Sequence, residues 1–449
     1  MRREFERQLD SRGHSNIRVI DCEIERVKYR PQRNCVVGFK LGLRDGAHEL
    51  EQRLYVGAFT ASEAKARHEK SIAEVRVETA LFAPVSFLPA LNVVIWTFPN
   101  DRKLLSLSLF ADKSLLQISL LGDVVAAYSG EDWEITGISH RISNYFPEHS
   151  CCVNARVALR HIESNDRRDW EIIGKIRNDE AGATTHLVMK SLFDRVGADV
   201  AYARPIMYQP AERIHWQARV PGVTLNSLLA AGSADSSILQ RVGRAVAALH
   251  GTRIAIPGRT TIGNLVENLI HAQSVITSVR PDCSTTIRRV VELLLDSMET
   301  LDPNTSVVSH GDLHSNNILV SPSQIYFVDM DRVALGPPLA DLGSFLAELV
   351  YRAGAKNQAW QFTQSKLNDV IAAYRERASW PVADDDTAWY TASALIHERA
   401  LRCVTSLKPG HYDLLGNIIA TAERIMRGGL TSESVATSFS RTQRANLRP

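Results

Sequence analysis

The chain is poor in features that mark several large classes of protein. Its six cysteines include no C-x-x-C pair and stand in no secretory context, which predicts reduced thiols rather than a disulfide framework. The net charge of +2 gives no support to a nucleic-acid or acidic-membrane partner. No apolar run approaches the length of a bilayer span, and the charged start MRREFERQLD lacks the apolar core of a secretory signal. These absences predict a cytoplasmic protein that binds neither nucleic acid nor membranes.

What remains is an ordinary globular composition in a chain too long for one domain. Its 449 residues are 45% hydrophobic and 23% charged, which suits two or three packed domains. After Arg427 the composition shifts to glycine, serine, threonine and arginine. We therefore expect a mobile tail over residues 427–449.

The strongest chemical signal is the segment SHGDLHSNNILVSPSQIYFVDMDRV, residues 309–333. A loop with Asp312 and Asn317 leads into an apolar stretch, a turn at 321–323 and a second apolar stretch that ends at Asp329. Such a loop and hairpin can gather one catalytic carboxylate and two oxygen ligands around Mg²⁺ and a phosphoryl group. Asp312 would position an acceptor hydroxyl and accept its proton. Asn317 and Asp329 would offer a neutral and a charged oxygen to the metal.

Two other interpretations of this segment were weighed. Asp and Asn are common turn residues because their side chains bond their own backbone, although their order and spacing here favour catalysis. His310 and His314, four apart, suggest a metallohydrolase. However, Gly311 breaks any helix between them, and a zinc site would need further ligands. We expect His310 to hydrogen-bond the backbone of the loop instead.

The motifs HGDLHSNN, FVDMD and GPPLADLGSF together resemble the aminoglycoside phosphotransferase and choline kinase family, which shares the protein-kinase-like fold. The resemblance covers roughly residues 130–425. It implies that Asp312 is the catalytic Asp, that Asn317 and Asp329 are metal ligands, and that Asp341 is a buried Asp that steadies the loop. It also implies ATP and Mg²⁺ as cofactors.

The same resemblance extends to a nucleotide-binding unit upstream. Lys175 lies in the strand-like run 171–176 and resembles the family's nucleotide-anchoring Lys; the alternative is a snorkelling edge-strand Lys. An amphipathic helix is predicted next, with one face formed by Ala183, Leu187, Val188, Ser191 and Leu192. This helix has no Glu to pair with Lys175, so Glu180, just before it, is the candidate.

Two further segments complete the predicted nucleotide site. No G-x-G-x-x-G precedes Lys175, and the hairpin turn at 145–150 would cover the phosphates, with its backbone N–H groups and Ser150 as contacts. Residues 217–219 resemble the hinge between lobes, where backbone groups from Gln217 to Arg219 would meet adenine.

The region before residue 130 repeats this unit. KYRPQRNCVVGFKLGL, from Lys28, resembles NYFPEHSCCVNARVAL, from Asn144, and the period-two apolar pattern recurs 116 positions later. LYVGAFTASEAK parallels EIIGKIRNDEAG, which places Gly57 opposite Gly174 and Ala58 opposite Lys175; a Trp follows each copy, at 96 and 216. We infer a duplicated small lobe that lacks the nucleotide Lys. A generic strand–helix pattern is the alternative, and a cap, a homodimer surface or a regulatory role are all open.

Together these features predict an α+β, bilobed protein-kinase-like fold with an extra N-terminal domain. The predicted parts are a degenerate small lobe at 1–130, the kinase small lobe at 131–222, a helical large lobe at 223–426 and the tail. The predicted activity is ATP-dependent phosphorylation of a hydroxyl on a small molecule, such as an aminoglycoside-like antibiotic, a sugar or an amino alcohol. A catalytically inactive kinase-like binding or regulatory protein is the alternative.

The acceptor is left open by the sequence. A polycation would favour acids such as those at 384–386 and Glu398, although a run of three acids also suits a helix start. A choline-type amine would call for an aromatic cage, for which Trp380, Trp389 and Tyr390 are candidates. On the predicted C-terminal helices, substrate contacts are sought among Glu398, Arg399, Arg402 and Tyr390.

Overall fold

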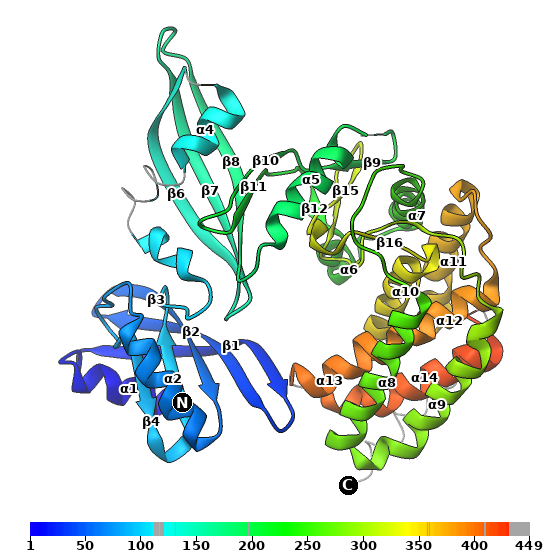
Figure 1. Ribbon diagram of the computed structural model, residues 1–449, viewed down its shortest axis with the longest axis horizontal. Coiled ribbons are helices and arrows are strands. Elements are labelled where there is room, and N and C mark those ends of the chain that lie inside the picture. Colours follow the sequence, from blue (N-terminus) through cyan, green and yellow to red (C-terminus); the bar gives the residue numbers. More distant parts are fainter. Residues whose placement is uncertain are drawn as a thin grey trace. The chain divides into compact units, whose positions relative to one another are not determined.

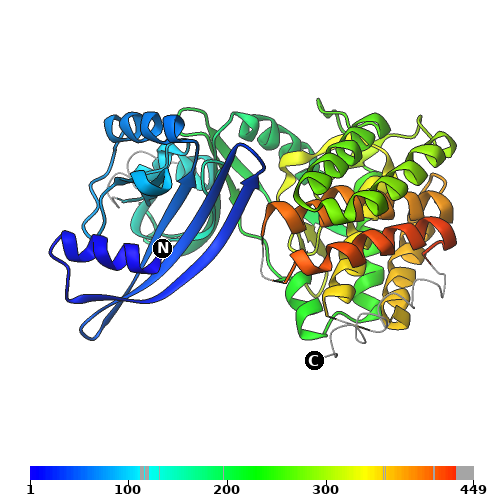
Figure 2. The same ribbon diagram turned by 90° about the horizontal axis from the view of Figure 1, so that it is seen from below.

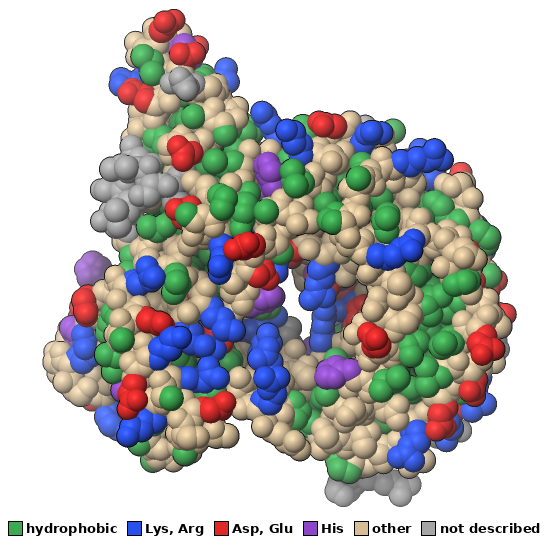
Figure 3. All heavy atoms as spheres, in the orientation of Figure 1, with side chains coloured by type: hydrophobic (Ala, Val, Ile, Leu, Met, Phe, Trp, Pro, Cys, Tyr) green, Lys and Arg blue, Asp and Glu red, His purple; other side chains and the backbone are tan. Residues whose placement is uncertain are grey.

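The computed structural model describes residues 1–111, 116, 121–130, 132–195, 197–356, 358, 360–407 and 410–430, so the predicted tail from 431 onward lies outside the described residues. The chain divides into two compact units. Unit 1 comprises Met1–His186 and Pro205–Arg219, and unit 2 comprises Leu187–Arg204 and Val220–Pro449. Within the described ranges, no helix is both long and apolar enough to cross a membrane. The face drawn in Figure 3 carries Lys and Arg interspersed with Asp and Glu, in keeping with the small net charge.

Unit 1 begins with a five-stranded antiparallel sheet that two helices accompany (Figure 1). Its strand order is β1-β2-β3-β5-β4. The bounds are α1 (Arg2–Ser11), β1 (Ile17–Arg30), β2 (Asn34–Asp45), β3 (His48–Ala58), α2 (Ala61–Ala73), β4 (Val85–Leu88) and β5 (Val93–Thr97). Phe5 and Leu9 of α1 are buried in one core cluster with Phe39 and Leu41 of β2, because alternate residues of a strand share one face.

The second half of unit 1 has the same architecture. Its strand order, β6-β7-β8-β11-β10, repeats the first order element by element. The bounds are α4 (Gly122–Ser129), β6 (Trp133–Phe146), β7 (Ser150–His161), β8 (Arg167–Arg177), α5 (Ala181–Phe193), β10 (Pro205–Gln209) and β11 (Ile214–Ala218). From Leu187 onward α5 belongs to unit 2. Each copy is thus a helix, a three-stranded meander, a second helix and a hairpin. The predicted duplication of the small lobe is confirmed as a repeat of topology.

The alignment of the two copies differs in detail from the sequence comparison. Cys35 pairs with Ala58, and Cys151, 116 positions after Cys35, pairs with Ile176. Counted along this ladder, the position of Lys175 is occupied by Gly57 and not by Ala58, and Ile95, not Trp96, matches Trp216. The predicted pairings were therefore wrong by one residue.

The cause of the shift lies in the turns. The first copy joins β2 to β3 through Gly46 and Ala47, whereas the second needs residues 162–165, closed by the bond from the His161 amide to the Asp166 carbonyl. The second turn is thus two residues longer, while the sequence comparison allowed for one. A shift of one residue moves every side chain of a strand to the opposite face of the sheet. The corrected alignment therefore puts Gly57 on the face of the first sheet that corresponds to the face of Lys175 in the second.

Unit 2 is mainly helical, and Figure 2 shows its helices packed side by side. The helices are α6 (Leu225–Ala231), α7 (Ser236–His250), α8 (Ile262–Val279), α9 (Ser284–Ser297), α10 (Pro338–Ala355), α11 (Trp360–Arg377), α12 (Asp384–Ala394), α13 (Leu401–Thr405) and α14 (Leu415–Gly428). A π-helix, Leu395–Ala400, joins α12 to α13. In α7, one face with Leu239, Val242, Val246 and Leu249 is buried. Asp235 caps the helix by accepting from the Ile238 amide at 2.9 Å.

Short strands position the loop of unit 2 that carries Asp312. Their bounds are β9 (Val200–Tyr202), β12 (Val223–Thr224), β13 (Val307–Ser309), β14 (Ile318–Val320), β15 (Ile325–Phe327) and β16 (Ala334–Gly336). β14 and β15 form the predicted hairpin, whose turn is closed by the Ser321 amide donating to the Gln324 carbonyl. β13 pairs with β16, so both ends of the 309–333 segment are anchored.

One expectation for the C-terminal helices needs correction. Trp389 and Tyr390 are buried in the core of unit 2, where the Trp389 indole donates to the Leu294 carbonyl at 2.8 Å, so they do not present an aromatic cage. Tyr390 is held there because its backbone lies against Gly343, where a Cβ would come within 2.6 Å of the Tyr390 carbonyl carbon. The acids at 384–386 form the first turn of α12, where negative charge is favourable, in agreement with the helix start that was weighed for them.

Candidate active site

The loop between β13 and β14 is shaped by Gly311 and His310. Gly311 has φ +76°, and a Cβ at this position would lie 2.2 Å from the Arg332 carbonyl oxygen, so the loop requires glycine here. The buried His310 ring accepts from the Asp312 amide at Nδ1 (3.3 Å) and donates from Nε2 to the Val328 carbonyl (3.0 Å). Both ring nitrogens form hydrogen bonds with backbone groups, as predicted. His310 is therefore not available as a metal ligand, which argues against a metallohydrolase.

Asp341, in the first turn of α10, stabilises this loop through hydrogen bonds to its backbone. Its carboxylate accepts from the amides of His310 and Gly311, the latter at 2.9 Å, and lies 3.2 Å from His250 Nε2. Burial acts to raise the pKa of Asp341, but the hydrogen bond from His250, the neighbouring His250 and His310 and the Gly311 amide outweigh it and lower that pKa. The predicted steadying role of Asp341 is confirmed. His250 also contacts the Tyr374 hydroxyl at 2.8 Å and is buried, so its place is structural.

The two predicted metal ligands lie next to each other on the hairpin. The Asn317 side chain donates from Nδ2 to the Asp312 carbonyl at 3.0 Å, while its backbone carbonyl accepts from the Val328 amide at 3.0 Å. These bonds connect the loop of Asp312 to the strand end that carries Asp329. Asp329 has φ +63°, a left-handed conformation that is uncommon outside glycine and is often found at functional sites.

The donor set fits a magnesium ion. The Nδ2 bond orients the Asn317 amide, so its Oδ1 points away from the loop carbonyl, and Asp329 adds a carboxylate. Mg²⁺ takes such oxygens, one or two from protein, and completes its shell with phosphates and water. Across the described residues, no group of three or more His, Cys, Asp or Glu is arranged to hold a metal. Asn317 and Asp329 would hold the ion.

Asp312 has two cationic or titratable neighbours. Its carboxylate lies 3.9 Å from Arg402 Nη2 and 4.0 Å from His314 Nε2, and its side chain is 28% exposed. Burial lowers the pKa of His314, and the positive charges of Arg399 and Arg402 lower it further. The negative charges of Asp312 and Glu348 act in the opposite direction but do not outweigh these effects. Of the C-terminal residues considered as substrate contacts, the structure thus brings Arg402 to Asp312, the candidate catalytic carboxylate.

A buried polar network behind the loop was missed by the sequence analysis. Glu348 of α10 accepts from the amide and the hydroxyl of Ser315, both at 2.6 Å, and Ser344 donates to Glu398 at 2.9 Å. Arg399 of the π-helix lies 3.4 Å from Glu398. The signal was available, because Ser344, Glu348 and Arg352 recur every fourth residue on a helix that is mainly apolar after Asp341.

The predicted nucleotide contacts lie in unit 1. Lys175, on β8, has Cys152 and His215 as cross-strand partners. Glu180 is exposed and forms an ion pair with Arg213 across 3.8 Å. The pairing of Glu180 with Lys175 stays a prediction.

Ser150 and the hinge residues also lie on this second sheet. Ser150 opens β7, buried, opposite Arg177. Gln217 pairs with Ile173, and the Arg219 amide donates to the Glu171 carbonyl at 3.0 Å. Unit 1 thus brings Lys175, Ser150 and the hinge to one sheet, and unit 2 brings Asp312, Asn317 and Asp329 to one loop and hairpin.

The face predicted for α5 needs correction. Leu187 is 66% exposed, whereas Val188, Met189 and Leu192 are buried in the core cluster of unit 2. Thr185, earlier on the helix, is also buried. The buried positions 185, 188, 189 and 192 follow helical spacing, as the predicted set did, but the stripe is rotated by about one residue.

The segment that contains this loop matches a known protein family. Residues 197–380 match the model of the phosphotransferase enzyme family, and they include Asp312, Asn317, Asp329 and Asp341. The resemblance to the aminoglycoside phosphotransferases and choline kinases that the motifs predicted is thereby confirmed. No curated protein matches the chain.

Two solved structures that are similar to the chain share little sequence with it. A Ralstonia eutropha protein named after the aminoglycoside phosphotransferases has 14% identity and a TM-score of 0.50, covering 68% of this chain and 98% of that one. A choline/ethanolamine kinase family protein from Mesorhizobium loti has 15% identity and a TM-score of 0.47, covering 71% and 97%. At this identity the first of these shows the fold, which is the predicted protein-kinase-like one.

Proposed function

We propose that this protein is an ATP-dependent phosphotransferase that phosphorylates a hydroxyl group of a small molecule with Mg²⁺ as cofactor. The observation that carries the proposal is the braced loop, in which Asp341 fixes the amides of His310 and Gly311 so that Asp312 stands beside Asn317 and Asp329. The match of residues 197–380 to the phosphotransferase family supports it. Lys175 would orient the nucleotide phosphates, with Ser150, Gln217 and Arg219 as further contacts.

Each of these residues has one role in the proposed reaction. Asp312 aligns the acceptor hydroxyl and takes its proton as the new O–P bond forms and the bond between the γ-phosphorus and the bridging oxygen breaks. Asn317 and Asp329 hold the cation, which offsets charge on the phosphates when it is bound. The Asp312 amide is fixed by His310, and its carbonyl by Asn317, so the carboxylate starts from a defined place.

The test is an acceptor screen with Mg²⁺–ATP that follows ADP release. The panel holds aminoglycosides, sugars, amino alcohols and homoserine. We expect acceptor-dependent release that Asp312→Ala reduces at least about a hundredfold, as loss of a positioned general base does. Asp296→Ala, an exposed Asp on α9, is the matched control and should behave as the unaltered protein.

The alternative, an inactive kinase-like binding protein, predicts a different result. It would bind nucleotide without acceptor-dependent turnover at any acceptor concentration. Absence of nucleotide binding would overturn both interpretations. A choline-type acceptor is disfavoured within this proposal because Trp389 and Tyr390, two of the three cage candidates, are buried. The homodimer through the N-terminal domain stays a prediction.

A further inference from the structure

The tip of the β6–β7 hairpin is held by a loop of the first copy. Asp101 accepts from the Glu148 amide and from the Tyr145 hydroxyl, both at 2.8 Å. Arg102 forms a two-bond ion pair with the Glu148 carboxylate, from Nε at 2.6 Å and from Nη2 at 2.7 Å. Paired bonds of this kind fix orientation as well as distance. These three contacts come from two adjacent residues, so one short loop grips the tip.

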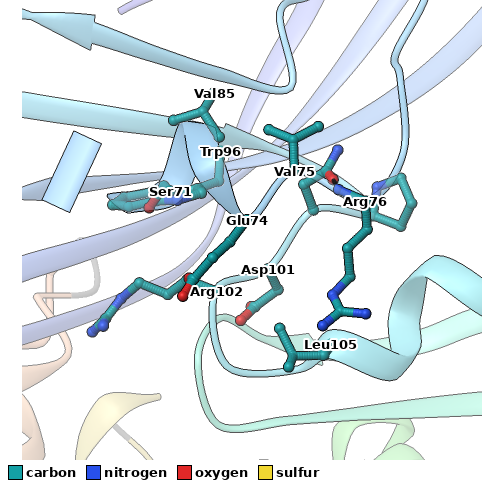
Figure 4. A pocket seen from close by; sticks show the side chains of 11 residues that line it. Ser71, Glu74, Val75, Arg76, Val85, Trp96, Asp101, Arg102 and Leu105 are labelled. Atoms are coloured by element: carbon teal, nitrogen blue, oxygen red, sulfur yellow. Dashed lines mark hydrogen bonds between the residues drawn. The ribbon is translucent and has the colours of Figure 1, made fainter. Parts of the chain in front are cut away.

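The grip is largely shielded from water. The Arg102 and Glu148 side chains are 22% and 12% exposed, so this ion pair is screened less than one on an open surface. Asp101 is buried, and burial raises its pKa although amides of Glu148 and Lys103 and the Tyr145 hydroxyl stabilise the charged form. Asp101 and Arg102 also line a small hollow in the first copy, where Figure 4 shows Asp101 between the diverging side chains of Arg76 and Arg102.

The tip is also held by its own copy and by the first sheet. The Asn178 side chain donates to the Glu148 carbonyl at 2.9 Å, and the Asn178 amide donates to the His149 carbonyl at 3.1 Å. The Arg26 guanidinium of β1 lies 3.3 Å from the centre of the Phe146 ring. Glu148 itself has φ +62°. A non-glycine residue persists in that conformation when its surroundings determine it.

The aromatic side chains of the first copy fill the face on which the second copy carries Lys175, and one of them contacts the β6–β7 hairpin. Gly57 stands at the ladder position of Lys175, and a Cβ there would lie 2.5 Å from the Phe59 ring. On the same face, Tyr55 stacks on Trp96 with centroids 4.7 Å apart and meets Tyr145 edge-on at 6.5 Å. The face that carries Lys175 in the second copy is thus filled by aromatic rings in the first, and one of them contacts the hairpin.

We propose that the first copy is a clamp that holds the phosphate-covering turn of the second copy, residues 147–149, in its nucleotide-binding position, with Asp101 and Arg102 as positioning residues. The inference rests on the proposed function, because that turn has a role only if nucleotide phosphates lie beneath it. Pro147 has no N–H, the Glu148 amide donates to Asp101 and the His149 amide donates to the Phe146 carbonyl at 3.0 Å, so the turn contributes a fixed conformation and not free N–H groups. A held turn keeps that conformation without a cost of ordering at each binding event.

The test compares nucleotide binding in variants of the ion pair. The probe is a fluorescent, non-hydrolysable ATP analogue with Mg²⁺, titrated into the full chain. If the released turn occupies the held position about a tenth of the time, Arg102→Ala and Glu148→Ala each raise the Kd about tenfold. The KM for ATP should rise in parallel, whereas the KM for the acceptor should stay unchanged. A variant that merely loses stability would not separate these two constants.

Two further variants sharpen the test. The exchange Arg102→Glu with Glu148→Arg restores the pair in reverse and should recover most of the lost affinity. Arg53→Ala removes another partly buried ion pair of the first copy, Arg53 with Glu25 at 3.1 Å and 19% and 25% exposed, and should leave the Kd unchanged. If Arg102→Ala does not fold, Arg102→Lys, which keeps the charge but loses the paired bonds, takes its place.

The outcomes separate the clamp from the proposed function. If the unaltered protein does not bind the analogue, the proposed function fails. If it binds and folded ion-pair variants bind equally well, the clamp is overturned while the proposed function stands. A Kd raised equally by Arg53→Ala also overturns the clamp, because the effect would then come from the stability of the first copy.

Discussion

Asp341 shows how much of the site can rest on one side chain. Its two oxygens receive the His310 and Gly311 amides and the His250 ring, so removing its charge leaves three buried donors with weaker acceptors. We expect Asp341→Asn to lose about 3 kcal/mol of unfolding free energy near neutral pH, as breaking a buried charged pair does, and to lose most of its activity. Urea unfolding and ADP release measure the two effects.

The pH dependence of this contribution has a definite sign. Because the pKa of Asp341 is lowered in the folded chain, its stabilisation is present above the ordinary carboxyl pKa of about 3.9 and is lost as the pH falls through the lowered value. The stability difference between the unaltered protein and Asp341→Asn should therefore shrink as the pH is taken from 7 to 3. A difference that grows on acidification would show that the carboxyl is protonated at neutral pH.

Gly311 gives a prediction that depends on space rather than charge. Gly311→Ala forces a left-handed alanine and brings its Cβ to 2.2 Å from the Arg332 carbonyl oxygen. The conformation alone costs about 1–2 kcal/mol, and the clash must shift the loop. We expect loss of activity with a melting temperature lowered by a few degrees. Gly416→Ala, at an open position on α14, is the control and should change neither property.

Arg402 predicts the charge that the acceptor site prefers. Its guanidinium, half exposed, lies 3.9 Å from Asp312 and should attract an acceptor with an anionic group near its hydroxyl while disfavouring a polycation. Exchange to Glu should shift the ratio of kcat/KM between matched cationic and anionic acceptors by about fivefold toward the cation, since exposed charges act weakly. An unchanged ratio would place Arg402 outside the acceptor site.

At the scale of single elements, α5 offers a direct test of the corrected face. Leu192 is fully buried and Leu187 is 66% exposed. Leu192→Ala should cost about 2–5 kcal/mol of unfolding free energy through the cavity it leaves, whereas Leu187→Ala should change it by less than about 0.5 kcal/mol. Denaturant unfolding distinguishes them. Equal effects would restore the helix face that the sequence predicted.

The elements that sequence reasoning could place are those whose partners are near in the chain. Asp312, Asn317 and Asp329 fall within one loop and hairpin, and the apolar runs of β14 and β15 fix its geometry, so the pattern predicted the arrangement. The strand repeat was predictable for the same reason, since period-two alternation is local. The site beyond this hairpin depended on contacts that local patterns do not encode.

The misses have separate physical causes. Arg402 was among the candidate contacts, but its position beside Asp312 could not be predicted, because it comes from a distant helix that follows a π-helix. The shift of Gly57 relative to Lys175 came from two extra turn residues, which side-chain alternation cannot count. Trp389 and Tyr390 were misjudged because aromatic residues suit both a core and a ligand cage.

At the scale of the whole molecule, the reactivity of the cysteine thiols depends on how deeply each is buried in the two units. All six cysteines are free, in agreement with the expected reduced state. Burial raises the pKa of Cys403 to about 12 and raises that of Cys151 further, so both exist as unreactive thiols near neutral pH. Native protein should therefore leave these two unlabelled by a thiol reagent, and denatured protein should label all six. Mass spectrometry of the labelled peptides locates them.

The grip of Asp101 on the second hairpin also sets an order of events during synthesis. Asp101 leaves the ribosome long before Tyr145 and Glu148, two of the donors that satisfy it in the folded chain. Until these arrive, its carboxylate keeps its water and the aromatic face of Tyr55 and Trp96 lacks Tyr145 as a cover. The first copy should therefore complete its folding only after β6 and β7 have emerged, so that two similar sheets mature together on the ribosome and not one after the other.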